Sequence, residues 1–421
     1  MPRFETLADW LYWQETLHPK KIDLGLERVA AVASRMGVLH PRHTVVTVGG
    51  TNGKGSSVAM LEAMLSVAGY RVGSYTSPHL LRYNERIRIN GVEVDDETLC
   101  AAFQAVDERR EGVSLSYFEF GTLAALQVLN NAALDIALLE VGLGGRLDAV
   151  NVIDPDIALV TSIGIDHTQW LGNDRESIGR EKAGIFRQGR PAICADSAPP
   201  SSLAEAAGMI GAHWYGLKEQ FHAVSGKDAW HWTGPGRRCD SLPFPALAGT
   251  HQLENASGVL MVLELLRERF PVSKAAIIAG LRSVTLPARC QVIPGPVETV
   301  LDVAHNPHGA ARLAELLRNR PCKGLTRLVL GMLDDKDVSG FSAVLTPEVD
   351  HWYLAGLNIE RGLTADALQQ RMSESIAPDR MHRFPDVESA CQQVHRVAMT
   401  GDRIIVCGSF YTVAAAMGCD V

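Results

Sequence analysis

The chain has 421 residues, of which 46% are hydrophobic and 21% are charged. This length predicts two or three domains and excludes a single small module, and the composition is typical of a globular protein with a sizeable core. The formal charge is −8, from 40 Lys and Arg against 48 Asp and Glu. An acidic chain without a long basic block is not expected to bind nucleic acid, because that affinity comes from neutralising many phosphates.

The eight cysteines are scattered along the chain, and no two of them form a CxxC pair. In a long chain without a secretory start, this pattern predicts reduced thiols. The N-terminal segment MPRFETLADW carries acidic residues where a signal peptide needs a cationic and then an apolar region, and no run of about 18 apolar residues occurs. We therefore expect a cytoplasmic protein that does not enter a membrane.

The N-terminal part of the sequence predicts two helices, followed by a strand, a glycine loop and a third helix. Helices are expected at 6–17 and from about 24 to 36, with a turn at His18-Pro19 between them. The β-branched run HTVVTV at 43–48 predicts a strand, which continues into GGTNGKGS and then into an Ala/Met/Leu helix that ends at Gly69.

Further along, two apolar runs predict buried parallel strands. Residues 135–141 (DIALLEV) and 156–163 (DIALVTSI) are too continuous for a sheet with one exposed face. Weaker strands that would extend the edge of this sheet are expected near 191–196, 212–217 and 228–247. The first α/β domain is predicted to span 1–286.

The segment 287–296 is predicted to be a linker, because it is rich in proline and glycine and follows a long helical stretch. Beyond it the alternation of strands and helices begins again and predicts a second α/β domain at 297–421. Its strands are expected at 298–304, 327–333, 351–356 and 402–408. Its helices are expected at 308–319, 336–345, 364–373 and 386–399, followed by a final helix.

The glycine loop predicts an ATP site. Successive glycines let backbone N–H groups converge on a phosphate at the positive end of the following helix, and Lys54 can reach the outer phosphates. The loop departs from the general Walker pattern, because Val48 stands at the first glycine position and Gly55 follows the lysine. The expected ATP-binding residues of the loop are Thr51, Asn52, Gly53, Lys54, Gly55 and Ser56.

Other motifs accompany the loop in order: TSPHL (76–80), ERIRING (85–91), LEVGLGGRLDAVN (139–151), TSIGIDHTQWLG (161–172), REKAGIF (181–187) and DVAHNPHG (302–309). With GGTNGKGS they resemble the folylpolyglutamate synthases, and among these the bacterial enzymes that also act as dihydrofolate synthase. The match covers nearly the whole chain. The family belongs to the ATP-dependent Mur-type ligases, so the resemblance implies an N-terminal P-loop ATPase domain with a mostly parallel sheet and a Rossmann-like, glutamate-side α/β domain at the C-terminus.

The resemblance also implies an activity. Such enzymes add L-glutamate to dihydropteroate and γ-linked glutamates to reduced folates. Joining a carboxylate to an amine in water is unfavourable, so ATP first converts the acid into an acyl phosphate, which the amine of glutamate then attacks. Magnesium and cationic side chains must offset the repulsion between the carboxylate and the γ-phosphate. We expect a monomer that uses ATP and Mg²⁺ and binds neither nucleic acid nor a membrane.

By the same resemblance, the magnesium ligands are Ser77, Glu140 and His167, and each follows a predicted strand. The carboxyl ends of the strands in an open α/β sheet lie at one edge, so these side chains can converge on the ATP loop. A lone histidine is more often structural than a magnesium ligand, and His167 is assigned here only as part of the set. Lys182 matches a carbamylated lysine of the family, which would help hold a second magnesium. Lys54, Lys182 and His167 are the expected catalytic residues.

The substrate residues also follow from the resemblance. Those expected to bind the pterin are Asp23, Leu24, Ser116, Tyr117, Phe118, Glu119, Leu147, Asp148 and Ala149. Further ATP contacts are expected at Asn255, Arg289 and Asp302, and the glutamate side is assigned to His305 and Ser409. Leu24 and Ala149 are small or apolar residues, which lie in cores more often than they bind ligands.

Two alternatives were weighed against this hypothesis. A peptidoglycan-precursor Mur ligase needs a substrate domain of roughly a hundred residues before the ATP loop, whereas only 48 residues precede Gly49. A non-catalytic P-loop nucleotide switch of the GTPase kind would need an NKxD stretch, which the sequence lacks. Both alternatives are therefore disfavoured.

Overall fold

The computed structural model describes residues 3–374 and 376–419, which form two compact units. The first unit runs to Ile163 and includes Trp170–Ala246 and Leu253–Val284. The second consists of Gly164–Gln169, Leu247–Gln252 and the chain from Thr285 onward. Within the described residues, no helix combines the length and apolar character that a membrane span requires.

The first unit is built on a sheet that has eight strands in the described part of the chain. The central strand β1 (Thr44–Gly49) pairs in parallel with β5 (Ile136–Glu140) and β6 (Ile157–Val160), and all three are buried. Across the sheet the order is β4 (Val92–Glu93), β3 (Ile87–Ile89), β2 (Val72–Tyr75), β5, β1, β6, β7 (Pro191–Cys194) and β8 (His213–Gly216). Only β3 and β4 run antiparallel to their neighbours.

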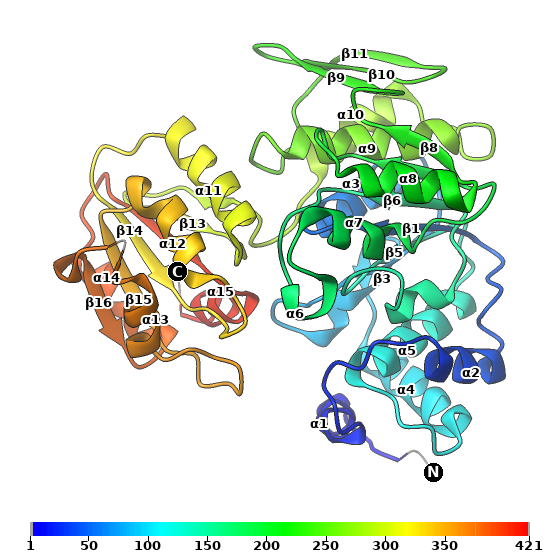
Figure 1. The fold of residues 1–421 in the computed structure, drawn as a ribbon, viewed down its shortest axis with the longest axis horizontal. Coiled ribbons are helices and arrows are strands. Elements are labelled where there is room, and N and C mark those ends of the chain that lie inside the picture. The colour runs from blue at the N-terminus through cyan, green and yellow to red at the C-terminus, as the bar shows by residue number, and fades with distance from the viewer. Residues whose placement is uncertain (1–2, 375, 420–421) are drawn as a thin grey trace. The chain divides into compact units, whose positions relative to one another are not determined.

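Helices cover both faces of this sheet (Figure 1). One face carries α1 (Leu7–Leu17), α2 (Glu27–Met36), α4 (Asp96–Arg110) and α5 (Tyr117–Asn131) toward β2, and α7 (Arg175–Ala183) and α8 (Ser201–Ile210) toward β7. The other face carries α3 (Lys54–Val67), α9 (Gln252–Leu265) and α10 (Lys274–Ser283). The short elements are α6 (Thr168–Leu171), η1 (Tyr83–Arg86) and η2 (Ala149–Val152). Apolar residues on both sides of each central strand explain why both faces are covered.

The predicted edge extension is right for β7 and β8 and wrong for residues 228–247. The strands β9 (His222–Ser225), β10 (Trp230–Thr233) and β11 (Arg238–Leu242) form a separate antiparallel sheet. The alternation in WHWT buries Trp230 and Trp232 on one face, and Trp232 Nε1 donates a hydrogen bond to Ser257 O of α9 at 3.2 Å. A strand with one apolar face suits such a small sheet better than the doubly covered parallel sheet.

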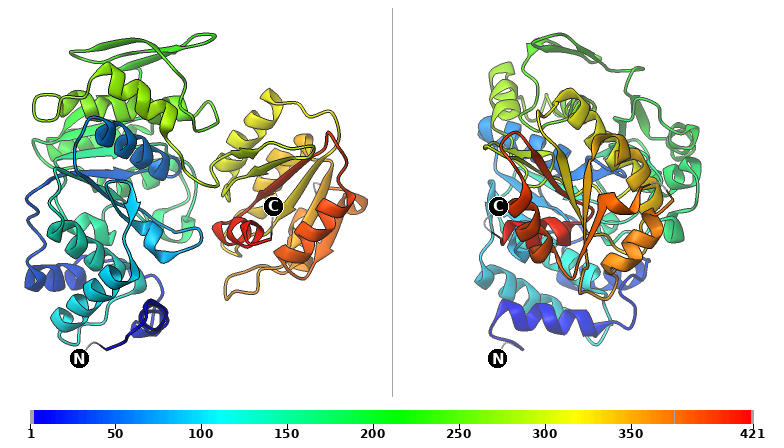
Figure 2. Two further views of the ribbon diagram at one scale, coloured as in Figure 1. Left: turned by 180° about the vertical axis from the view of Figure 1, so that it is seen from behind. Right: turned by 90° about the vertical axis from the view of Figure 1, so that its left-hand side faces the viewer.

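The second unit contains a sheet of six described strands with helices on both faces (Figure 2). Their order is β12 (Gln291–Ile293), β13 (Glu298–Leu301), β17 (Arg403–Cys407), β14 (Thr326–Leu330), β15 (His351–Ala355) and β16 (Met381–Phe384). The helices are α11 (Pro307–Asn319), α12 (Val338–Leu345), α13 (Ala365–Met372), α14 (Val387–Val397) and α15 (Phe410–Met417), with η3 (Thr346–Glu348) and η4 (Pro378–Arg380) between strands. Only β12 is antiparallel to its neighbour.

Two strands of this sheet were not predicted. The strand β12 lies within the segment predicted as a linker, so that part of 287–296 is built into the second sheet, and the change between units falls between Val284 and Thr285. The strand β16 has the sequence MHRF, of which two residues are exposed. It carries too little apolar periodicity to be recognised from sequence.

Local capping sets the helix boundaries near the site. The side chain of Ser116 accepts from the N–H of Glu119 while the Glu119 carboxylate accepts from the N–H of Ser116, which is a capping box at the start of α5. The helix α2 begins at Glu27 and not near residue 24, and it ends at Gly37, which has a φ of 71°. Asp23 and Leu24 therefore lie in the loop that precedes α2.

Candidate active site

The phosphate loop, Gly49–Ser56, connects β1 to α3 and contains two glycines with positive φ. Gly50 has a φ of 137°, and a Cβ atom there would lie 1.9 Å from Thr161 Oγ1. Gly53 has a φ of 90°, and a Cβ atom there would lie 2.4 Å from Asn255 Oδ1. Both positions therefore require glycine, and Asn255 of α9 packs against the loop, beside the other predicted ATP residues.

The end of β6 holds the loop in place. Thr51 N donates to Ser162 O at 2.6 Å. The hydroxyl of Thr161 donates to Asn52 O at 2.7 Å, and that of Ser162 donates to the same carbonyl at 3.1 Å. Because these bonds fix the carbonyl of Asn52, the loop keeps one conformation before α3 begins at Lys54. The sequence analysis did not identify Thr161 and Ser162 as site residues.

Two lysines meet at one carbonyl of the loop. Lys54 Nζ donates to Gly50 O and to Thr51 O, both at 3.1 Å. Lys182 Nζ, on α7, donates to Gly50 O at 2.9 Å, and this lysine is only 4% exposed. Two amines beside one loop create a local site of positive potential in an acidic chain, if both are protonated. The structure thus brings together Lys54 and Lys182, which are 128 residues apart (182 − 54).

Two of the predicted magnesium ligands also lie together. Glu140 ends β5 beside Val48 of β1 and is 5% exposed, and its Oε2 accepts from the N–H of Ser77 at 3.3 Å. A carboxylate and a serine hydroxyl are oxygen donors that suit Mg²⁺, which usually takes one or two carboxylates and completes its shell with phosphates and water. Among the residues that the structure describes, no three His, Cys, Asp or Glu side chains form a metal cluster. His167 lies in the second unit, with a φ of 51°.

Asp148 organises the loop that follows β5. Its Oδ2 accepts from Leu143 N at 2.7 Å and its Oδ1 from Val150 N at 3.0 Å. The side chain is buried, and burial raises the pKa of this carboxyl to about 6, although the backbone hydrogen bonds act in the opposite direction. Its neighbours Leu147 and Ala149 are half-buried and buried, respectively. Asp148 therefore shapes the predicted substrate loop through its backbone.

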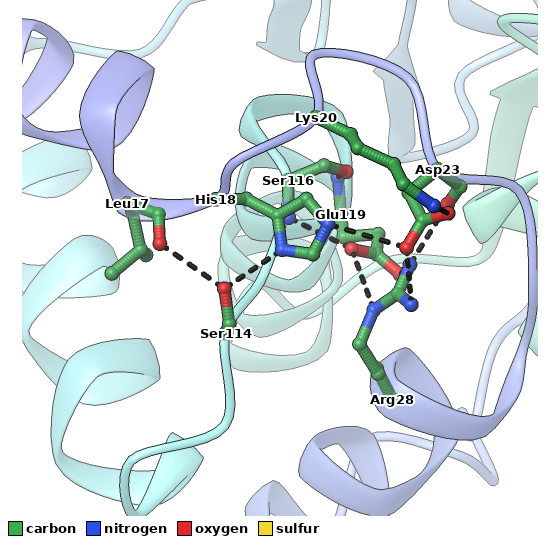
Figure 3. Close-up of polar contacts among 8 residues, drawn as sticks. All are labelled: Leu17, His18, Lys20, Asp23, Arg28, Ser114, Ser116 and Glu119. Carbon is green, nitrogen blue, oxygen red and sulfur yellow. Dashed lines mark hydrogen bonds and ion pairs between the residues drawn. The ribbon is translucent and has the colours of Figure 1, made fainter.

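The loop before α2 joins the start of α5 through one arginine (Figure 3). Arg28 Nη1 lies 2.7 Å from Asp23 Oδ2, and Arg28 Nη2 donates to Glu119 Oε1 at 3.0 Å. Asp23 also accepts from Lys20 at 3.3 Å and contacts His18 at 3.2 Å. We refer to these residues, with the hydroxyls of Ser114 and Ser116, as the Asp23 cluster: His18, Lys20, Asp23, Arg28, Ser114, Ser116 and Glu119. It unites two of the three predicted pterin segments.

The third segment is connected through an aromatic ring. Phe118 stacks on Tyr75 with ring centroids 6.2 Å apart, and a Cβ atom at Gly142 would lie 2.5 Å from its ring. Its neighbour Tyr117 lies under the guanidinium of Arg86 at 5.7 Å. The first helical turn of α5 thus contacts the loop after β5, while Leu24 is half-buried before α2.

In the second unit, the predicted ATP residue Asp302 braces the backbone. Its carboxylate accepts from Cys290 N and from Ala304 N, both at 2.6 Å. Arg289 lies with its guanidinium 4.9 Å from the ring centre of Phe410, which follows Ser409. The hydroxyl of Ser409 accepts from Thr412 N at 3.0 Å and caps α15. Arg289 and Ser409 are therefore neighbours, and the Ser409 hydroxyl has a structural role as a helix cap.

The other predicted glutamate-side residue, His305, contacts a buried carboxylate that the sequence analysis missed. Asp166 lies 3.3 Å from His305 Nε2 and 2.7 Å from Lys336 Nζ, and it accepts from Asn306 Nδ2 at 2.8 Å. Burial alone would raise the pKa of Asp166, but the hydrogen bond from His305 and the charge of Lys336 hold it well below its usual range. Asp166 precedes His167 within the motif TSIGIDHTQWLG, and Lys336 lies in DDKD, so its place in that motif is the signal that could have indicated Asp166.

Family models match both parts of the chain. Residues 48–263 match the Mur ligase middle domain, and residues 288–410 match the Mur ligase, glutamate ligase domain. The dihydrofolate synthase/folylpolyglutamate synthase of Escherichia coli (strain K12) is 44% identical over 411 residues, which cover 98% of this chain and 94% of that protein.

Solved structures match over nearly the whole length. E. coli FolC in complex with DHPP and ADP has a TM-score of 0.93 at 44% identity and covers 98% of this chain and 97% of its own. A bifunctional folylpolyglutamate synthase/dihydrofolate synthase with Mn, AMPPNP and L-glutamate bound has a TM-score of 0.91 at 46% identity, with 98% of each chain covered. The predicted α/β fold of the Mur ligase type is confirmed by these matches.

Proposed function

The chain belongs to the dihydrofolate synthase/folylpolyglutamate synthase family of ATP-dependent ligases, and from this premise we propose that it adds L-glutamate to dihydropteroate and γ-linked glutamates to reduced folates. The reaction proceeds through an acyl phosphate formed at the expense of ATP. The relatives were solved with DHPP and ADP, and with Mn, AMPPNP and L-glutamate, which supports these substrates and a divalent metal.

One observation carries the proposal: the amines of Lys54 and Lys182 both reach the carbonyl of Gly50, beside the strand end that carries Glu140. In this arrangement the loop binds the ATP phosphates through its backbone, and Lys54 neutralises charge on the outer phosphates. The other loop residues, Thr51 to Ser56, and Asn255 hold the nucleotide in position. If Lys182 is carbamylated as in the family, it keeps one N–H for the Gly50 carbonyl and carries a carboxylate that can bind metal, and the positive charge beside the loop then comes from Lys54.

Magnesium would be held by Glu140 and Ser77, with carbamylated Lys182 as a further ligand, and His167 is assigned to the same set by the family resemblance alone. When bound, it screens the substrate carboxylate from the γ-phosphate and so favours phosphoryl transfer. Other groups of the chain position this site. The backbone N–H of Ser77 donates to Glu140, and the Thr161 and Ser162 hydroxyls keep the loop in the conformation that receives the phosphates.

The acid-bearing pterin is assigned to the Asp23 cluster, the first turn of α5 and the Asp148 loop. Asp23 and Glu119 supply acceptors for ring donors, Tyr117 and Phe118 supply aromatic surfaces, and Leu24, Leu147 and Ala149 supply apolar contacts. In the second unit, Arg289 and Asp302 are assigned to the nucleotide, and His305 and Ser409 to glutamate.

We also propose a monomeric enzyme in the cytoplasm. Eight free thiols are present in the described residues, which suits a reducing compartment. The other weighed activities, a different Mur-type amide ligase or a nucleotide switch without catalysis, find no feature here that favours them over glutamate ligation.

The test is ATP-dependent incorporation of labelled glutamate with dihydropteroate and a reduced folate supplied separately. We expect labelled product from both acceptors, with release of ADP and phosphate in equal amounts. A protein that hydrolyses ATP without forming product would support the switch, and a product formed with only one acceptor would limit the activity to that substrate.

A further inference from the structure

His18 lies in the turn between α1 and α2 and contacts two groups with its two ring nitrogens. Its Nδ1 is 2.7 Å from Ser114 Oγ, and its Nε2 is 3.2 Å from Asp23 Oδ2. The side chain is only 10% exposed. Both nitrogens of this partly buried imidazole therefore contact a polar partner.

Ser114 holds the other side of the ring. Its Oγ lies 2.7 Å from His18 Nδ1 and 3.1 Å from Leu17 O, so the imidazole is fixed between the end of α1 and the segment before α5. The ionised carboxylate of Asp23 can only accept a hydrogen bond, so Nε2 of His18 is the donor in the contact at 3.2 Å.

Arg28 holds the same carboxylate from the other side. Its Nη1 lies 2.7 Å from Asp23 Oδ2, and its Nη2 donates to the backbone carbonyl of Asp23 at 2.8 Å. The same fork donates to both carboxylate oxygens of Glu119, at 3.0 and 3.4 Å. A planar guanidinium can contact the Asp23 carboxylate, the Asp23 backbone carbonyl and the Glu119 carboxylate at once. A lysine cannot, because it offers a single nitrogen.

His18 and Arg28 contact one oxygen of the Asp23 carboxylate, and Lys20 contacts the other. Oδ2 is shared by His18 and Arg28, whereas Oδ1 is contacted at 3.3 Å by Lys20, whose side chain is 68% exposed. An exposed lysine contributes little to fixing its partner, so a ligand can displace it from Oδ1 at small cost. Oδ2 is therefore held in place, whereas Oδ1 is contacted by an exposed lysine that a ligand can displace.

From this geometry we infer that His18 and Arg28 are positioning residues for the pterin ring: they hold Asp23 by Oδ2 and by its backbone, so that Oδ1 accepts hydrogen bonds from N–H donors of the substrate. This inference rests on the proposed function, because it assigns the ligand of Asp23 to the pterin. Neither residue touches the reacting carboxylate, so their loss weakens substrate binding and leaves ATP binding intact.

The experiment measures equilibrium binding of dihydropteroate to the full-length protein, followed by steady-state kinetics. Arg28→Lys keeps the charge but loses the fork, and His18→Ala removes the imidazole. Each should raise the Kd and KM for dihydropteroate about 10- to 100-fold, the expected loss for a charged hydrogen bond, with the KM for ATP unchanged. The matched control is Arg35→Lys on the same helix, whose guanidinium donates to carbonyls of Arg109 and Arg110 instead.

His18→Gln separates positioning from a purely structural role. A glutamine amide can donate to Asp23 in place of the imidazole, so this variant should recover much of the affinity lost in His18→Ala. The charged groups that face the pair are Lys20, Arg28 and, beyond Arg28, Glu119. All three are present in both His18 variants, so the difference in Kd between these variants reports the hydrogen bond to Asp23.

Equal dihydropteroate affinity in the wild type and in folded His18→Ala and Arg28→Lys would overturn the positioning role while leaving the proposed function intact. A parallel loss of ATP affinity would also overturn it, since that result indicates general damage to the fold. Wild-type protein that binds no dihydropteroate at all would overturn the proposed function, and this inference with it. If Arg28→Lys does not fold, the two His18 variants, in the turn between α1 and α2, give the same decision.

Discussion

The phosphate loop and the Asp23 cluster, to which we assign ATP and the pterin, are built from different parts of the chain. In the loop, contiguous residues and their backbone make the site: two glycines adopt positive φ, and the hydroxyls of Thr161 and Ser162, which follow β6, fix a carbonyl. In the cluster, side chains far apart in sequence make it, because Arg28 reaches Glu119, 91 residues away. A site made by backbone depends on a short motif, whereas a site made by ion pairs depends on the whole fold.

The largest effect on turnover is expected for Lys54, the cationic side chain of the phosphate loop. Lys54→Ala should lower turnover on the order of 100- to 1000-fold, because an ammonium at the phosphates is removed. Lys274→Ala is the matched control, since Lys274 also occupies the first position of a helix but is exposed. Steady-state kinetics and circular dichroism of both variants check this. Near-normal turnover in Lys54→Ala would mean that the loop does not bind ATP.

Lys182→Ala should cost about 100-fold in turnover, since its amine shares the Gly50 carbonyl with Lys54. A carbamate at this position keeps one N–H for that carbonyl and adds an anion, so small carboxylates should restore part of the activity of the variant. Mass measurement of the native protein detects the added carboxyl group. Full activity in the variant, or an unmodified lysine in fully active enzyme, would remove the carbamate from the mechanism.

Glu140→Gln should raise the magnesium concentration needed for half-maximal activity about 10- to 100-fold, because an amide is a much poorer ligand than a carboxylate. The titration is run at saturating ATP, and Glu62→Gln is the comparison: Glu62 is also a buried glutamate, but it accepts from Ser74 Oγ at 3.0 Å. If both variants need the same magnesium as the wild type, Glu140 is not a ligand.

Two glycines with the same φ of 90° can show whether the loop requires glycine at Gly53. A Cβ atom at Gly53 would meet Asn255, whereas one at Gly69 has nothing within 4 Å. Gly69→Ala should therefore cost about 1–2 kcal/mol of unfolding free energy for the backbone alone, and Gly53→Ala about 2–5 kcal/mol. Denaturant unfolding gives both values. Equal losses would show that Asn255 moves aside without cost.

The smallest effect is the pH dependence of stability caused by Asp148, whose buried carboxylate accepts hydrogen bonds from the backbone. Its folded pKa of about 6 lies above the ordinary value of 3.8, so the folded state binds the proton more tightly than the unfolded state does. Unfolding free energy should therefore fall by about 1–3 kcal/mol as the pH rises from about 4 to 6, relative to Asp148→Asn, which does not titrate. Parallel pH profiles for the two proteins would show that the carboxyl titrates normally.

The sequence predicted what is encoded by short-range patterns. The strands β1, β5 and β6 are continuous apolar runs, and the loop after β1 has a spacing of glycines that few other structures need. The family resemblance then supplied residues such as Asp23 and Glu119, which the structure brings together through Arg28.

Several features could not be predicted, and the reason is physical. His18 looked like an ordinary residue of a turn, because its partner Ser114 is 96 residues away and only the packing of α1 against α4 and α5 brings them together. The separate sheet around β10 and the exposed strand β16 were missed because their sequences carry weak or one-sided periodicity. Pairings across long separations and short exposed strands leave little trace in a local pattern.

The two large sheets share one feature at their margins. Each has a very short antiparallel strand at one edge: β4 has two residues and β12 has three. An edge strand exposes unpaired N–H and C=O groups that can add strands from another molecule, and a short edge offers few of them. At these margins the chain therefore gives little template for sheet-to-sheet aggregation, which favours keeping the protein dispersed at the high concentrations used for crystallisation or scattering.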